Sequence, residues 1–97
     1  MTDTLHLEII TAGGAVVDTP AVQVTLPLAD GEVGILPGHA PLLGALMCGV
    51  VRYTAAGKEH YCAVSPGTVN VAAGNVTVLA RTAERAPDID LTRAEAA

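Results

Sequence analysis

The residues with the clearest chemical potential lie in one short stretch, Asp30 to Leu43, which holds three glycines and two prolines. Within it, Glu32 offers a carboxylate and His39 an imidazole. A histidine acts as a general base only beside a nucleophile or a carboxylate that orients it. The chain has no Gly-x-Ser-x-Gly motif, and Glu32 has no second acid at a fixed spacing. We therefore expect no catalysis, and we expect His39 to hydrogen-bond its own loop.

The sequence also contains no motif for metal binding or for phosphate binding. The three histidines are scattered, and Cys48 and Cys62 do not have a metal or redox spacing. We expect two free thiols, with Cys62 as a small core residue because it alternates in phase with Val64. The glycines precede no helix with a following lysine, so they predict strand turns rather than a phosphate-binding loop. No metal site and no cofactor are predicted.

Composition limits the possible classes of protein. Ninety-seven residues predict one domain, and with 51% hydrophobic residues but no Phe or Trp its core must be Val, Leu, Ile and Ala. The net charge is -5 and the five bases form no cluster, which argues against nucleic-acid binding. No apolar run approaches the roughly 20 residues of a membrane span. The N-terminus lacks the basic flank of a signal peptide.

Period-two alternation indicates strands at regular spacing along the chain. A second short strand is predicted to start at residues 16–18, with Pro20 as the break before the third strand. The other predicted strands cover residues 5–10, 21–26, 32–36, 42–47, 50–54, 59–64, 68–71 and 76–80. Pro27 is expected to stop the third strand, and for 42–47 periodicity alone leaves a helix open. Residues 55–58 and 72–75 predict hairpins. This rhythm favours an all-β sandwich or flattened barrel of about nine or ten short strands.

The pattern changes after Ala80. Residues 81–88 are polar without alternation, and Pro87 forbids a helix running through them. Asp90 is a good N-cap for residues 91–97, which are rich in helix formers. We therefore predict a β-sandwich domain over 1–81, followed by a linker and a short C-terminal helical stub over 82–97.

The segment Gly31–Leu42, which we call the signature segment, reads Gly-Glu-Val-Gly-Ile-Leu-Pro-Gly-His-Ala-Pro-Leu. It resembles the signature of the epsilon subunit of the rotary (F-type) ATP synthase. Residues 50–52, 74–80 and 83–90 resemble the same subunit, so the match covers essentially the whole chain. Two positions depart from the family pattern: Pro66 stands in a usual Ser-Gly-Gly, and Cys48 replaces a frequent proline.

This resemblance implies a non-catalytic rotor subunit that links the central-stalk gamma subunit to the membrane c ring and couples ion transport to ATP synthesis. The implied location is the cytoplasmic face of the cell membrane, as a peripheral protein whose membrane contact comes only through the complex. The implied interface residues are Glu32, His39, Ala40, Pro41 and Leu42. The alternative is a free-standing β-sandwich module that binds a small ligand in a concave apolar pocket.

The sequence Ile-Asp-Leu-Thr-Arg-Ala at 89–94 resembles the nucleotide-binding motif of some bacterial epsilon subunits. The resemblance makes Glu84, Asp90, Arg93 and Ala94 a partial nucleotide site. In those proteins arginines on later helices complete it, and this chain stops at the first turns. We therefore expect ATP to bind only if the full helical region is present. The same helices form the family's inhibitory arm, which reaches the catalytic head.

Overall fold

The computed structural model describes residues 4–85 and contains ten strands over that range, with no helix. The strands run as follows: β1 Leu5–Thr11, β2 Gly14–Ala21, β3 Gln23–Leu28, β4 Gly31–Ile35, β5 Leu42–Leu46, β6 Gly49–Ala55, β7 Lys58–Val64, β8 Gly67–Ala72, β9 Asn75–Ala80 and β10 Ala83–Arg85. The expected all-β architecture of nine or ten short strands is confirmed. The predicted helical stub lies outside the described residues.

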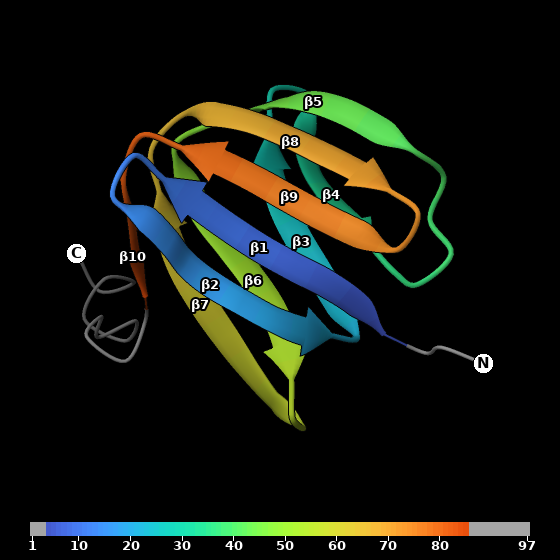
Figure 1. Cartoon of the computed structure of the whole chain (residues 1–97). Helices are drawn as coiled ribbons and strands as arrows, with labels where there is room; N and C mark the ends of the chain where they lie inside the picture. Colours follow the sequence, from blue (N-terminus) through green and yellow to red (C-terminus); the bar gives the residue numbers. More distant parts are fainter. Residues whose placement is uncertain (1–3, 86–97) are drawn as a thin grey trace, which may run out of the picture.

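The strands form two layers joined at a corner (Figure 1). The front layer has the order β5-β8-β9-β1-β2, and the rear layer has the order β4-β3-β6-β7-β10. All pairings are antiparallel except β1 with β9, which brings the start of the chain beside residues 75–79. β3 connects the layers because it pairs with β6 through Gln23 to Thr25 and with β5 at Leu28. The chain between β5 and β6 turns this corner at Met47 and Cys48.

Alternation along each strand builds the core between the layers. Leu7 and Ile9 on β1, and Val76 and Val78 on β9, are fully buried, while the residues between them face outward. In the described part of the chain, no polar or charged residue is buried. The side chains are aliphatic, apart from Tyr53 and Cys62. Burial of each large aliphatic side chain contributes about 1.5–3 kcal/mol, so this shared inner face stabilises both layers.

Two prolines lie inside strands that were predicted to end there. Pro27 is within β3 at the corner, where its carbonyl accepts a hydrogen bond from the Met47 N–H at 2.8 Å. Pro20 is within β2, which ends the strand order and so has one unpaired edge. Proline cannot donate to a ladder, and it is tolerated at edges and irregular positions. The expectations that Pro27 stops the third strand and that Pro20 breaks the chain before it are therefore wrong.

Both predicted hairpins are confirmed, each closed by two residues of positive φ. Ala56 and Gly57 join β6 to β7 with φ of 54° and 76°, and Ala73 and Gly74 join β8 to β9 with φ of 52° and 81°. Two successive positive φ angles define the type I′ turn, whose twist matches that of antiparallel strands. A strand that the sequence did not predict, β10, pairs with β7 through Ala83 to Arg85. The sheet thus continues past residue 81.

Candidate interaction site

The signature segment folds as an exposed strand, a tight turn and the start of a second strand. β4 is the outermost strand of the rear layer, and its last residue, Ile35, is fully buried. The next residue, Leu36, points outward and is 55% exposed. Gly38 then has a φ of 88°, a conformation that side-chain-bearing residues rarely adopt. This positive φ fixes how the chain crosses towards β5.

His39 is held by its own loop. Its backbone N–H donates to the Leu36 carbonyl at 3.0 Å, and its ring Nδ1 lies 2.7 Å from the Ala40 carbonyl oxygen. A carbonyl can only accept, so Nδ1 carries the proton. His39, Ala40 and Pro41 are exposed, and Leu42 is partly buried as the first residue of β5. This bonding accounts for the orientation of His39 without a catalytic partner.

Glu32 lies at the other end of β4, beside the tight turn from β3. It is opposite Pro27 in the β3–β4 register. Leu36, where the His39 turn begins, is four residues further along, a distance of about 13 Å at ~3.3 Å per residue. The Glu32 carboxylate pairs with the Arg52 guanidinium at 3.1 Å, and their side chains are 59% and 42% exposed. Arg52 reaches it from β6 across β3. The structure thus exposes Glu32 and His39 but does not bring them together.

Sequence reasoning missed Arg52 as the partner of Glu32, because 20 residues separate the two and only the order β4-β3-β6 makes them neighbours. A second cluster also escaped sequence reasoning: His6, Glu8 and Asp18 share one face of β1 and β2. A detectable signal existed in the spacing of His6 and Glu8 on one strand face. The contribution of Asp18 depends on the β1–β2 register.

Of the residues proposed for nucleotide binding, only Glu84 is described. It is exposed on β10, opposite Ala63 of β7. Asp90, Arg93 and Ala94 lie outside the described residues. A groove of about 400 Å³ runs beside the signature segment and is lined by Thr4, Leu5, His6, Pro20, Pro37, Gly38, Ala73 and Gly74.

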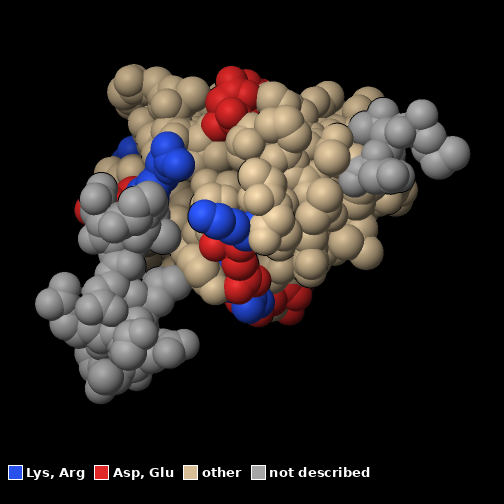
Figure 2. Space-filling view, turned by 90° about the horizontal axis from the view of Figure 1, so that it is seen from below, with Lys and Arg blue, Asp and Glu red and all other residues tan. Residues whose placement is uncertain are grey.

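The front layer carries a wide outward face without charge on β5, β8 and β9. We call it the uncharged face, and it consists of Leu43, Ala45, Thr68, Asn70, Ala72, Asn75, Thr77 and Leu79. Leu43 is 79% exposed and Leu79 is 49% exposed. The view from below, on the side away from β5 and β8, shows acidic and basic side chains gathered beside one another (Figure 2). An exposed face that lacks charge and includes large apolar side chains is typical of a protein interface.

Cys48 and Cys62 are both free thiols, as expected. Cys48 is exposed at the corner, and Cys62 is fully buried on β7. Burial raises the pKa of the Cys62 thiol above its usual range, so it stays protonated and inert at neutral pH. Within residues 4–85 no helix is both long and apolar enough to cross a bilayer.

Fold and exposed surfaces together define a ten-stranded β-sandwich with a wide uncharged face on β5, β8 and β9. Residues 4–86 match the family described as "ATP synthase, Delta/Epsilon chain, beta-sandwich domain". Two relatives named ATP synthase epsilon chain come from Nitratidesulfovibrio vulgaris (strain DSM 19637 / Miyazaki F) and Lawsonia intracellularis. They are 48% and 44% identical over 97 residues, which are all of this chain and 72% and 73% of the relatives. The chain therefore belongs to the family of ATP synthase epsilon chains.

Solved structures support the fold. A chain in the Euglena gracilis mitochondrial ATP synthase, solved as OSCP/F1/c-ring, matches with a TM-score of 0.84 and 23% identity. The match covers 99% of this chain, which spans only 62% of that solved chain. A chain from the central stalk and c ring of the Tetrahymena thermophila mitochondrial enzyme matches with a TM-score of 0.68 and 12% identity, covering 80% of this chain and 63% of that one. At such identities the likeness concerns the fold alone.

Proposed function

We propose that this chain is a non-catalytic rotor subunit that links the gamma subunit of the central stalk to the membrane c ring. In this role it couples ion transport to ATP synthesis by transmitting torque, at the cytoplasmic face of the membrane. The observation that carries the proposal is the uncharged face, in a chain whose family is that of ATP synthase epsilon chains. A rotor subunit needs two contact surfaces on one stiff body, and the sandwich offers two candidates.

The uncharged face is the proposed gamma-binding surface. Its side chains lie in cross-strand rows, because Leu43 is opposite Asn70, which is opposite Thr77. A parallel row contains Ala45, Thr68 and Leu79. Apolar residues flanked by amides and hydroxyls resemble the centre of an interface, where charged residues are depleted. Leu43 is the strongest candidate anchor, since it is more exposed than Leu79, the other large apolar residue of this face.

The signature segment is the proposed c-ring contact. Its exposed residues supply one carboxylate, one imidazole and the rigid Pro-Gly turn, on a framework fixed by the buried Ile35. Glu32 already pairs with Arg52, so an approaching basic or amide group would share a carboxylate that is held in place. The contact residues proposed are Glu32, His39, Ala40, Pro41 and Leu42. Because Glu32 and His39 lie at opposite ends of β4, they would meet different parts of the ring.

The gamma-binding half is tested by calorimetric titration of the cognate gamma subunit with the chain and two matched variants. Leu43→Glu places a charge in the uncharged face, whereas Val22→Glu places the same charge at another exposed apolar residue, between β2 and β3. We expect Leu43→Glu to weaken binding at least tenfold, equivalent to about 1.4 kcal/mol. Val22→Glu should bind like the unmodified chain.

Equal affinities for all three proteins would refute the assignment of this face. If the unmodified chain does not bind gamma, the rotor role is refuted and the ligand-binding alternative is favoured. In that case the groove beside Pro37 and Gly38 would be the place to look, since its volume lies within the range of small-molecule sites.

A further inference from the structure

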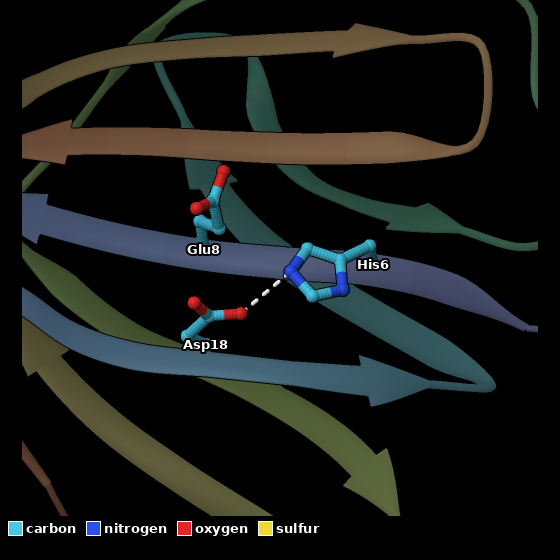
Figure 3. A group of neighbouring side chains, drawn as sticks. All are labelled: His6, Glu8 and Asp18. Carbon is cyan, nitrogen blue, oxygen red and sulfur yellow. Dashed lines mark ion pairs between the residues drawn. The ribbon is translucent and has the colours of Figure 1, made fainter.

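A group of metal-ligating side chains lies on the front layer, beyond the uncharged face (Figure 3). His6 and Glu8 come from β1 and Asp18 comes from β2. The His6 Nε2 atom is 2.6 Å from Asp18 Oδ1, and one ligand atom from each of the three residues lies within 4.8 Å of the other two. In the figure the His6 imidazole lies over β1, Asp18 lies between β1 and β2, and Glu8 rises from β1 on the side nearer β9.

The backbone fixes this grouping. Residues two apart on a strand point to the same face, so His6 and Glu8 are neighbours on the outside of β1. Glu8 is directly opposite Asp18 in the antiparallel register, and a bulge follows immediately, between Ile9 and Ile10. The residues in between, Leu7, Ile9 and Val17, are buried and hold both strands against the core. Three ligand-bearing positions are therefore set by rigid strands rather than by a loop.

The local charges favour a bound cation. Glu8 and Asp18 are two carboxylates facing each other across a strand pair, an arrangement that is destabilising by itself. On the other side of β1, His6 and Glu8 are opposite Asn75 and Thr77, which carry no charge. In the described part of the chain, the ion pairs are His6 with Asp18 and Arg52 with Glu32, so no lysine or arginine neutralises Glu8. A divalent ion would offset both carboxylates at once.

We propose that His6, Glu8 and Asp18 bind one divalent transition-metal ion, for which Zn²⁺ is the test ion. One imidazole nitrogen with two carboxylate oxygens is a donor set suited to zinc, whereas magnesium and calcium prefer oxygen alone. Zinc bonds of about 2.0–2.2 Å place adjacent ligand atoms ~3.3 Å apart. The His6–Asp18 contact would open slightly and the more distant carboxylate oxygen would close in, both by side-chain rotation. The partly exposed site leaves the remaining coordination positions to water.

The first experiment is calorimetric titration of Zn²⁺ into the metal-free chain carrying Cys48→Ser, which removes the exposed thiol as a competing ligand. We expect one equivalent to bind, and we expect His6→Ala, Glu8→Gln and Asp18→Asn each to lower the affinity at least tenfold. His39→Ala and Glu59→Gln remove an exposed histidine and an exposed acid outside the cluster and should leave the affinity unchanged. Magnesium and calcium should give no comparable heat.

A second measurement identifies the ligand directly. In the NMR spectrum of the imidazole nitrogens, Zn²⁺ should shift the signals of His6 and leave those of His39 and His60 in place. Circular dichroism checks that each variant is folded. The nearly isosteric Asp18→Asn remains informative if His6→Ala does not fold. Absence of binding, or an affinity that is insensitive to all three substitutions, would overturn the proposal and leave a simple cross-strand ion pair.

Discussion

The front and rear layers of the sandwich have the same inner chemistry but different outer faces. Inside, both contribute buried aliphatic side chains with strict alternation. Outside, β5, β8 and β9 of the front layer carry no charged residue and expose Leu43 and Leu79. The exterior of the rear layer carries the Glu32–Arg52 ion pair and a hydrogen bond of 2.5 Å from the Tyr61 hydroxyl to Glu59.

Folding constrains the inner faces of the two layers more strongly than their outer faces. The inner faces must match each other, since they bury one common core. The outer faces have no such constraint, so a charge-free exterior over three strands of the front layer, β5, β8 and β9, needs another reason. An interface supplies one, because its buried centre is poor in charged residues. The charged exterior of the rear layer has the composition of an ordinary solvated surface, apart from the signature segment at its edge.

The largest effect is expected from Gly67→Ala at the start of β8. A Cβ atom there would lie 1.8 Å from the carbonyl oxygen of Leu79, a backbone atom that cannot move without distorting β9. Overpacking of this kind costs about 3 kcal/mol or more, and the strain would fall on the layer that carries the uncharged face. Urea unfolding should show the loss.

Gly34→Ala in β4 of the rear layer is the matched control. A Cβ atom at Gly34 would meet nothing within 4 Å, and its backbone angles are ordinary. Its stability should change by less than about 1 kcal/mol. Similar losses for the two variants would contradict the assigned close approach of β8 to β9.

Gly38→Val is expected to have the next largest effect. Space is not the obstacle, because a Cβ atom there would also meet nothing within 4 Å. The φ of 88° is the obstacle, and a β-branched residue held in this region costs about 1–3 kcal/mol. Thermal unfolding should therefore show a clear loss for Gly38→Val and almost none for Gly34→Val, which lies in an extended strand. A stable Gly38→Val would mean that the signature segment can take another shape.

The substitution Glu32→Lys tests whether Glu32 stabilises the fold or binds a partner. The Glu32–Arg52 pair is half exposed, so replacing it by two like charges should cost less than about 1 kcal/mol. In reconstituted ATP synthase, ATP-driven ion pumping should fall relative to ATP hydrolysis, because the proposed contact would carry the wrong charge. The swapped pair Glu32→Lys/Arg52→Glu should regain stability but not coupling. Regained coupling would show that the ion pair matters and a ring contact at Glu32 does not.

The sequence predicted the strands well because alternation reports burial directly. β1, β6 and β9 each place apolar residues at every second position, and the Gly-containing turns from β6 to β7 and from β8 to β9 are short. Sequence-based prediction failed where the position of a residue in the tertiary structure determines whether it belongs to a strand. Pro27 is tolerated because the chain turns a corner beside it, and β10 exists because β7 offers an open edge. Neither the corner nor the edge is encoded in local pattern.

The candidate sites divide in the same way. The signature segment was recognisable because its glycines and prolines specify a local shape, and the positive φ at Gly38 follows from that. The pairing of Glu32 with Arg52, and of His6 with Asp18, depends on strand order and register. Cross-strand partners at separations of 12 and 20 residues have no periodic signature. Sequence reasoning therefore singled out Glu32 but missed its partner Arg52, and it missed both members of the His6–Asp18 pair.

The smallest expected effect concerns the inner face of the rear layer, where Tyr53 stacks on His60 with ring centroids 5.2 Å apart. Burial raises the pKa of Tyr53 above its ordinary value of 10.0, while the nearby Arg85 opposes the shift because its positive charge favours the phenolate. A raised pKa means that the folded state holds its proton more tightly than the unfolded chain. The stabilisation is therefore complete below pH 10.0 and is lost as the pH rises through the folded-state pKa.

Absorbance titration tests this in a Tyr61→Phe background, where Tyr53 is the sole tyrosine. Its midpoint should lie above pH 10.0, and Arg85→Met should raise it further by removing the opposing charge. Arg81→Met, at an exposed residue in the same segment, is the control and should leave the midpoint unchanged. Because Arg85 belongs to β10, the difference between the midpoints of the Arg85→Met and Arg81→Met variants also reports whether β10 holds Arg85 near Tyr53 in solution. If Arg85→Met leaves the midpoint unchanged or lowers it, β10 does not hold its charge beside Tyr53, and the difference between the layers must be explained without that strand.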